Sequence, residues 1–270
     1  MKVSNLYVRY KGEEFFALED VSFSARTGEL ILIAGPSGSG KTTLARIIAG
    51  LIPHLYPAEV KGEVDIMGIN PITQGISKLT GIVGFVSQTP EMFTTSIVVI
   101  EELAMSLINR GVPRDEIIEK VMRVAKWLGI EDLLNRSTFE LSSGQMQKVT
   151  LASVLVDDPL VLVLDEPLAR LDKKSCLEVA RILRELANNG KLVLVFEHHL
   201  DEILPLADRV IVLNKGRIIA NAKPRDVVKL LYNIDIPEIS EAFLLAKEDF
   251  IPLTVDEAEK YVRSIKRRMV

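Results

Sequence analysis

Consecutive apolar residues, rather than alternating ones, form several short runs along this chain. The clearest runs are residues 30–34, 160–164, 192–196 and 210–213, each of strand length and rich in Val, Ile and Leu. A strand that is apolar on both faces is buried on both, as in a parallel sheet covered by helices. The pattern therefore predicts an α/β fold with a mainly parallel central sheet, which a further run at 81–86 extends.

The first part of the chain carries a different strand pattern. Residues 3–10 and 17–25 are rich in Val, Phe and Tyr and are separated by a polar turn at 11–14. Residues 62–67 are a third strand candidate. These segments predict an N-terminal antiparallel β subdomain beside the parallel sheet.

Helical periodicity dominates two further regions. Between about residues 90 and 156 the amphipathic segments include 98–108 and 115–128, which predicts a helical subdomain. Residues 221–270 are expected to form a small helical appendage, in which Thr254 and Glu257 have the spacing of a capping box. The helix that follows is expected to pack one apolar stripe on the domain or on a second subunit. This stripe consists of Val255, Ala258, Val262 and Ile265.

Composition narrows the class of protein. The 270 residues are 48% hydrophobic and 26% charged, as in a globular chain of one large domain with or without an appendage. The formal net charge of −4 argues against a general nucleic-acid binder. Cys176 is the single cysteine, so we expect no disulfide framework, and a reducing, cytosolic setting fits. We expect no signal peptide and no membrane span of ~18 apolar residues, so any membrane role would come through a partner.

The strongest chemical signal lies between the strand at 30–34 and a helical segment at 44–49. Here the spacing G-x-x-x-x-G-K-T is complete, in the strand–loop–helix context of a phosphate-binding loop. The N–H groups of such a loop and the positive end of its helix converge on a polyphosphate. Lys41 is expected to reach the β- and γ-phosphates, and Thr42 to ligate Mg²⁺. The residues expected to bind a nucleoside triphosphate are Gly35, Pro36, Ser37, Gly38, Ser39, Gly40, Lys41, Thr42 and Thr43.

Two acidic residues follow the strand at 160–164. Ligands of parallel sheets bind at the carboxyl ends of the strands, which is where Asp165 and Glu166 lie. Asp165 can hold Mg²⁺, and Glu166 can deprotonate an attacking water as a general base. Two solvated acids at the end of a strand are the alternative, which the upstream phosphate loop disfavours.

Polar residues also follow two neighbouring strands. Gln88 comes after the strand at 81–86 and could reach the same metal or water with its amide oxygen. His198 follows the strand at 192–196 and could touch the γ-phosphate, although the adjacent His199 leaves this position open by one residue. A third segment, L-S-S-G-Q at 141–145, precedes a predicted helix at 146–155. Its serines suit an N-cap and its N–H groups suit an anion, and the residues alone do not decide between the two.

Together these residues resemble the nucleotide-binding subunit of an ABC transporter, over about residues 1–220. In this resemblance residues 35–42 are the Walker A loop and 161–166 are Walker B. The resemblance implies ATP hydrolysis, with ATP and Mg²⁺ as cofactors. It makes Glu166, His198 and Gln88 the catalytic residues, and Thr42, Gln88 and Asp165 the metal ligands.

The resemblance also implies that two such subunits face each other head to tail. The signature motif would then contact the ATP of the partner subunit, and residues 168–172 would form the D-loop, which ends at Asp172. Tyr10 fits the aromatic residue that stacks on adenine, with a core tyrosine as the alternative and Phe15 or Phe16 as substitutes. The signature residues are Ser142, Ser143, Gly144 and Gln145.

Within this superfamily the segments 51–57 and 109–116, the Glu197-His198 pair and the appendage are most similar to ATPases of energy-coupling-factor transporters, the cobalt and vitamin importers. This implies a peripheral subunit at the cytoplasmic face of the cell membrane. Its implied partners are a second ATPase subunit, a transmembrane coupling subunit and a membrane substrate-binding subunit, and no nucleic acid. The ATPase of a conventional ABC importer is the alternative, and a soluble ABC ATPase outside transport is less favoured.

Two positions depart from the family pattern. Ser143 stands where the signature usually has glycine, and Arg170 stands where the D-loop often has a small residue. The Walker motifs are complete. We therefore expect a non-identical second ATPase and two unequal composite sites, while a tolerated Ser143 that only caps its helix is the alternative.

Overall fold

A six-stranded sheet forms the centre of the fold in this computed structural model, which describes residues 1–88, 96–231, 236–248 and 250–268. The strand order is β5-β6-β7-β3-β8-β9, and the strands from β5 to β8 run parallel while β9 is antiparallel to β8. The prediction of a mainly parallel sheet is confirmed. The strands are β3 (Leu30–Ala34), β5 (Val83–Val86), β6 (Val161–Asp165), β7 (Leu192–Glu197), β8 (Arg209–Asn214) and β9 (Arg217–Ala222).

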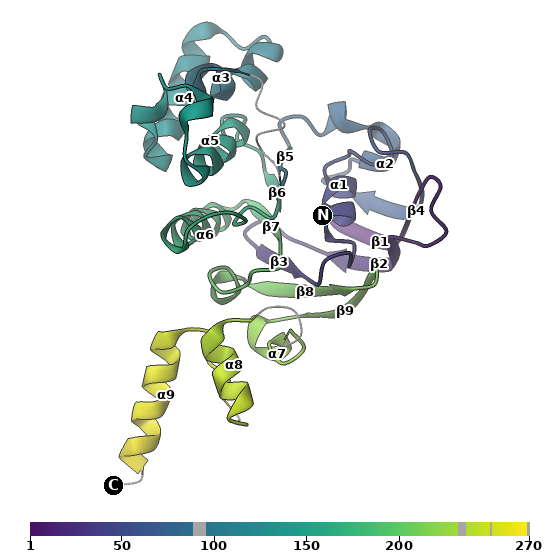
Figure 1. The fold of residues 1–270 in the computed structure, drawn as a ribbon. Helices are drawn as coiled ribbons and strands as arrows, with labels where there is room; N and C mark the ends of the chain where they lie inside the picture. Colours follow the sequence, from purple (N-terminus) through teal and green to yellow (C-terminus); the bar gives the residue numbers. More distant parts are fainter. Residues whose placement is uncertain (89–95, 232–235, 249, 269–270) are drawn as a thin grey trace.

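A second, antiparallel sheet has the order β2-β1-β4 and lies against one face of the central sheet (Figure 1). Its strands are β1 (Lys2–Tyr10), β2 (Leu18–Ser24) and β4 (Ala58–Asp65). The predicted antiparallel subdomain is therefore confirmed. β4 begins four residues before the predicted strand, because Ala58 and Val60 already pair with β1.

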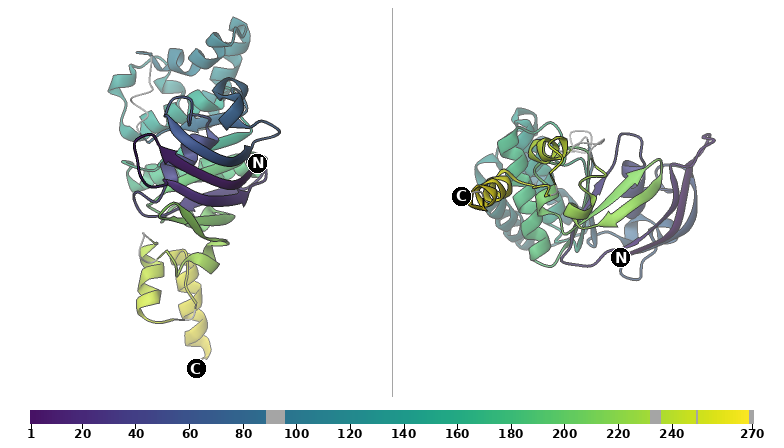
Figure 2. Two further views of the ribbon diagram at one scale, coloured as in Figure 1. Left: turned by 90° about the vertical axis from the view of Figure 1, so that its right-hand side faces the viewer. Right: turned by 90° about the horizontal axis from the view of Figure 1, so that it is seen from below.

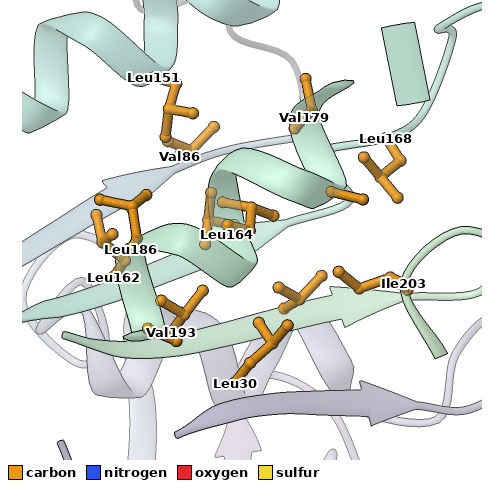
Figure 3. Packing of buried hydrophobic residues seen from close by; sticks show 14 of the residues in the cluster. Leu30, Val86, Leu151, Leu162, Leu164, Leu168, Val179, Leu186, Val193 and Ile203 are labelled. Carbon is orange, nitrogen blue, oxygen red and sulfur yellow. The ribbon is translucent and has the colours of Figure 1, made fainter. Parts of the chain in front are cut away.

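The continuous apolar runs are explained by two cores, one on each face of the central sheet. In β3, Leu30 and Leu32 point to one core, while Ile31 and Ile33 point to the other. Figure 3 shows the first core, where Leu30 and its neighbours from β6 and β7 pack against Val179 and Leu186 of α6 (Lys173–Asn188). The second core joins the sheet to α1 (Lys41–Ile48), β1 and β2.

Helices beyond the sheet form two outlying groups. α3 (Val99–Asn109), α4 (Arg114–Leu128) and α5 (Ser143–Leu155) stand together at one end of the molecule, and α8 (Glu238–Leu245) and α9 (Val255–Arg268) extend from the other end (Figures 1 and 2). Residues 89–95, which include the predicted start of the helical subdomain, lie outside the described residues. Two short α-helices, α2 (Pro71–Gln74) and α7 (Pro224–Val227), complete the α-helices of the described residues.

The C-terminal appendage differs from its prediction in two details. The Thr254 hydroxyl accepts the N–H of Glu257 at 3.3 Å, but the Glu257 carboxylate accepts from Leu253 N at 2.8 Å rather than from Thr254, so the capping box is half formed. Along the predicted stripe, Val255 is 63% exposed and Val262 is 42% exposed. The described part of the chain therefore leaves much of this stripe uncovered. Within those residues, no helix has the length and apolar character needed to cross a membrane.

Candidate nucleotide-binding and catalytic site

The phosphate loop connects β3 to α1 at the carboxyl edge of the central sheet. Gly40 has φ of +104°, and a Cβ there would lie 2.6 Å from the Ala17 carbonyl oxygen. At Gly35 a Cβ would lie 2.3 Å from the carbonyl oxygen of Leu213. Both positions therefore require glycine, because a side chain at either would collide with a carbonyl oxygen. Gly40 also has a backbone conformation that other residues rarely adopt.

Lys41 begins α1 and folds back over the loop. Its Nζ donates hydrogen bonds to the carbonyl oxygens of Gly35 at 2.7 Å and Pro36 at 3.2 Å. Burial lowers the pKa of Lys41, and the nearby carboxylates of Glu166, Asp165 and Glu197 oppose this shift. The ammonium group is thus held at the loop by acceptors that an anionic phosphate can replace.

Asp165 ends β6 beside the phosphate loop and is 2% exposed. The Thr42 hydroxyl donates to Asp165 Oδ1 at 3.3 Å. Burial raises the pKa of Asp165 to about 6, and the nearby Glu166 adds to the rise. A buried carboxylate beside a hydroxyl suits a hard cation such as Mg²⁺, which would restore the ionised form of the acid.

Glu166 lies between two other predicted catalytic residues. Its Oε2 accepts a hydrogen bond from Gln88 Nε2 at 2.6 Å, and its Oε1 is 3.3 Å from His198 Nδ1. The latter contact lacks hydrogen-bond geometry, and among the described residues His198 Nδ1 has no hydrogen-bond partner. Glu166 itself has φ of +53°, and its N–H donates to the carbonyl of Phe196 at 2.8 Å. The structure therefore brings Gln88, Glu166 and His198 together, and their catalytic roles stay a prediction.

Tyr10 ends β1 next to the phosphate loop. Its hydroxyl lies 3.1 Å from Thr43 Oγ1, and its ring packs partly on the second core. Phe16 makes a T-shaped contact with Tyr7, and Phe15 is 80% exposed. Tyr10 is thus the predicted aromatic residue with a contact to the loop, and its role toward adenine stays a prediction.

A surface pocket gathers part of the predicted site. Its lining contains residues of the phosphate loop together with Gln88 and Glu166, but not Tyr10, Asp165 or His198. It also contains Ala17, which the sequence did not indicate. Ala17 precedes β2 and supplies the carbonyl against which Gly40 packs. The full lining is Ala17, Ser37, Gly38, Gly40, Lys41, Thr42, Thr43, Gln88 and Glu166.

The signature residues do not line this pocket. Ser142 caps α5: its hydroxyl accepts the N–H of Gln145 at 3.3 Å, and the Gln145 side chain accepts the N–H of Ser142 at 3.0 Å. Ser143 is exposed and is the first residue of α5, three residues earlier than predicted, because the capping box fixes the start. Gly144 is buried, and a Cβ there would lie 2.7 Å from Ser175 Oγ.

The D-loop candidate leads directly into α6. Asp172 caps this helix by accepting the N–H groups of Lys174 at 3.0 Å and Ser175 at 3.1 Å, and it also accepts the Ser175 hydroxyl at 2.7 Å. Arg170 has φ of +64°, in the left-handed region that non-glycine residues rarely adopt. Through Ser175 the cap of α6 touches Gly144, so the signature and D-loop candidates lie side by side in one chain.

The residues present fit a magnesium nucleotide. Ser39 Oγ is buried without a hydrogen-bond partner among the described residues, which is a donor that a phosphate oxygen can satisfy. Gly38, with φ of +76°, has open space where a Cβ would stand. The described residues contain no group of three or more His, Cys, Asp or Glu that could hold a metal ion alone. Thr42, Asp165 and Gln88 therefore suit a cation that also binds phosphate oxygens.

The chain is a P-loop nucleoside triphosphatase by three features: the phosphate loop, the mainly parallel sheet and the acidic pair Asp165-Glu166. A profile of the ABC transporter family matches residues 18–169, and the chain belongs to that family. The domain is therefore of the ATP-hydrolysing class, and the predicted family resemblance is confirmed.

Relatives in two archaea show how much of the chain is shared. A putative ABC transporter ATP-binding protein of Sulfurisphaera tokodaii is 40% identical over 229 residues, which is 85% of this chain and 48% of that protein. A putative ABC transporter ATP-binding protein of Pyrococcus horikoshii is 37% identical over 228 residues, which is 84% of this chain and 80% of that protein. The chain thus spans about half the length of the first of these curated relatives and four fifths of the second.

Solved structures share the same fold. One is cbiO1 from Clostridium perfringens, described as part of the ABC transporter complex cbiONQ, with a TM-score of 0.76 and 31% identity over 84% of this chain and 90% of that one. Another is the dimeric ATP-binding cassette MJ0796 in a post-hydrolysis state with ADP and Pi. Its TM-score is 0.72 at 28% identity, over 83% of this chain and 98% of that one.

Proposed function

We propose that this chain is the ATP-hydrolysing subunit of an energy-coupling-factor type importer for a vitamin or a metal ion. The single observation that carries the proposal is the Glu166 carboxylate, 2.6 Å from Gln88 Nε2 and 3.3 Å from His198 Nδ1 at the phosphate-loop pocket. The importer type is supported by the segments 51–57 and 109–116 and by the likeness to cbiO1.

The residues of the site divide the work between binding and proton transfer. The loop N–H groups and Lys41 would bind the β- and γ-phosphates. Glu166 would take the proton of the attacking water, a contribution of typically about 10²–10⁴-fold in rate. His198 and Gln88, on either side of that carboxylate, would hold it and the water in position. Thr42, Asp165 and Gln88 would hold Mg²⁺, which when bound neutralises charge on the phosphates.

Gln88 can interact with both Glu166 and the metal because its amide group has a donor nitrogen and an acceptor oxygen. Its Nε2 donates to Glu166, so its oxygen is left to accept a hydrogen bond or to ligate a cation. Gln88 also stands at the junction between β5 and the helical region that starts with α3. We propose that it couples the contents of the nucleotide site to the position of that region.

Two ATPase subunits would share each nucleotide in this proposal. The signature residues 142–145 lie outside the pocket of their own chain, as expected if they serve a partner's ATP. Ser143 is exposed at the start of α5 and stands where the family signature usually has glycine. This departure supports a non-identical second subunit, which would supply a signature with the usual glycine to the Walker motifs of this chain.

The appendage at 221–270 is proposed as a contact between the two ATPases. Val255 and Val262 of α9 are 63% and 42% exposed, whereas Ala258, on the same stripe, is buried against the described chain. The uncovered half of the stripe offers an apolar surface of the kind that subunit contacts bury. A transmembrane coupling subunit and a membrane substrate-binding subunit complete the assembly, which places the chain at the cytoplasmic face of the membrane.

Affinity purification from detergent-solubilised membranes tests this function. We expect the chain to retain a second ATPase, a membrane coupling protein and a small membrane protein that binds the solute. Recovery of a permease together with a separate extracellular binding protein would instead indicate a conventional ABC importer. Recovery of no membrane protein under conditions that preserve other transporters would contradict the transport role.

A further inference from the structure

Glu197 is a glutamate with 0% exposure at the end of a strand that is otherwise apolar. It is the last residue of β7, the strand between β6, which carries Asp165, and β3, which leads into the phosphate loop. In the register of the sheet Glu197 pairs with Ala34, the residue before Gly35. The carboxylate therefore lies at the centre of the sheet edge that bears the nucleotide site.

Both carboxylate oxygens of Glu197 are engaged by backbone N–H groups. Oε1 accepts the N–H of Leu168 at 2.8 Å, and Oε2 accepts the N–H of His198 at 3.1 Å. Leu168 is two residues after Glu166 and is the first residue of the D-loop candidate. Glu197 thus ties together the two chain segments that carry Glu166 and His198, although Glu166 and Glu197 are 31 positions apart in the chain.

Burial of the Glu197 carboxylate costs free energy of desolvation, and an apolar residue would fill the same position in the sheet. Burial raises its pKa to about 7, while its hydrogen bonds to the backbone N–H groups of Leu168 and His198 oppose the rise. Among the described ion-pair distances, the nearest nitrogen of a basic side chain is Nδ1 of His198, 3.8 Å from Glu197 Oε2. The preceding residues, Leu192 to Phe196, are fully apolar, and a further apolar residue would avoid the cost of desolvation.

We propose that Glu197 is a positioning residue, which holds the segment after Glu166 and the backbone of His198 so that the Glu166 carboxylate and the His198 imidazole stay 3.3 Å apart. This inference rests on the roles proposed above for Glu166 and His198. The fixed anchor at Leu168 extends the effect to the D-loop candidate, because Leu168 is buried in the first core and its carbonyl accepts from Cys176 Sγ at 3.6 Å. Glu197 would therefore set the geometry of catalysis and leave ATP binding to the phosphate loop.

Glu197→Gln tests this role, because it keeps the shape of the side chain but turns one acceptor into an NH₂ donor that faces an N–H group. In the complex with its partner subunits we expect kcat for ATP to fall by roughly 10- to 100-fold, as misplacement of a catalytic group does. The Kd for ATP should stay within about threefold of the wild type, since the hydrogen bonds that hold Lys41 go to Gly35 and Pro36 rather than to Glu197. The control is Glu63→Gln on the exposed surface of β4, for which both constants should be unchanged.

Parallel variants separate the failure of this inference from the failure of the proposed function. If Glu166→Gln and His198→Ala abolish turnover while Glu197→Gln keeps kcat within twofold of the wild type, the positioning role is wrong. If Glu166→Gln and His198→Ala themselves keep normal turnover, the proposed site is wrong. A Glu197→Gln protein that loses ATP affinity and kcat equally would also contradict positioning.

A measurement on the unaltered chain covers the case in which Glu197→Gln does not fold. Hydrogen exchange should show the amides of Leu168 and His198 protected to the same degree, because one carboxylate holds both. Exchange rates that differ by more than roughly tenfold would overturn the shared anchor.

Discussion

Lys148 Nζ in α5 lies 2.7 Å from Glu178 Oε2 in α6, and this ion pair joins the helical region to the core of the molecule. Gly144 and Ser175 meet one helical turn closer to the start of the same two helices. Trp127 of α4 adds a hydrogen bond from Nε1 to Glu185 Oε1 at 3.1 Å. One face of α6 therefore contacts both α4 and α5, the helix that presents the signature residues.

We predict a measurable coupling between Lys148 and Glu178 in unfolding. The pair is partly exposed, with 22% and 38% of the two side chains accessible, so a double-mutant cycle should give on the order of 0.5–1 kcal/mol. The hydrogen bond from Lys148 holds the pKa of Glu178 below its usual range, so this coupling is present above the ordinary pKa of glutamate and is lost as the pH falls. Urea unfolding of the single and double alanine variants at neutral pH measures it, and a coupling of zero would show that the two helices are held by packing alone.

Lys41→Ala should remove most of the affinity for Mg·ATP and all turnover. Lys41 contributes the charge that meets the phosphates, and its two hydrogen bonds are to loop carbonyls rather than to the core. The fold should therefore survive, which circular dichroism and the unfolding midpoint will check. A Lys41→Ala protein that hydrolyses ATP normally with its partners contradicts the assignment of the phosphate loop.

The exposed Ser143 predicts two unequal nucleotide sites in a heterodimer. In such a pair only the site on the partner's Walker A motif would meet Ser143, while this chain's own ATP would meet the partner's signature. ATP turnover should be low for the purified chain alone, should rise when the partner is added, and should change at one site with Ser143→Gly. Brisk turnover by the chain alone, unaffected by a partner or by Ser143→Gly, excludes this arrangement.

Stability of the nucleotide-free and metal-free chain should fall as the pH rises. Burial raises the pKa of Glu197 to about 7 and that of Asp165 to about 6, so the folded chain binds these protons more tightly than the unfolded chain does. Their stabilising effect is complete below the ordinary carboxyl pKa and is lost as the pH rises through about 6 to 7.

Glu197→Gln should flatten this dependence of the free energy of unfolding on pH. The contribution that the substitution removes is on the order of 3 kcal/mol, for a rise in the pKa of Glu197 to about 7. Urea unfolding in EDTA at several pH values between about 5 and about 8 measures the slope. Glu63→Gln, which is exposed, should keep the wild-type slope. An unchanged slope in Glu197→Gln would mean that Glu197 is ionised to the same extent in the folded and unfolded chains.

Local signals in the sequence predicted much of the fold and most of the site. The phosphate loop could be recognised because its function depends on spacing within eight residues, and β3, β6 and β7 because both of their faces are buried. β9 and α6 were not predicted. β9 is an edge strand with alternating exposure, and α6 shows its buried face only as a helical stripe.

Contacts between segments that are distant in the chain could not be predicted from local sequence patterns. The role of Glu197 depends on the N–H of Leu168, 29 residues away, and only the fold brings the two together. Likewise Ser142 could be either a cap or an anion ligand from its sequence alone, and the structure shows the cap with its partner Gln145. The contact of Gly144 with Ser175 depends on the packing of α5 on α6 and leaves no periodic trace.

The rate of ATP hydrolysis by the Glu166→Gln variant tests the central claim most directly. The carboxylate lies between Gln88 and His198, and replacing it with an amide removes the proton acceptor while leaving the phosphate loop intact. We predict that turnover in the complex falls by about 10²–10⁴-fold and that ATP remains bound, so that ATP-bound dimers accumulate on size-exclusion chromatography. Wild-type turnover by Glu166→Gln, or a monomer in saturating Mg·ATP, would contradict the account.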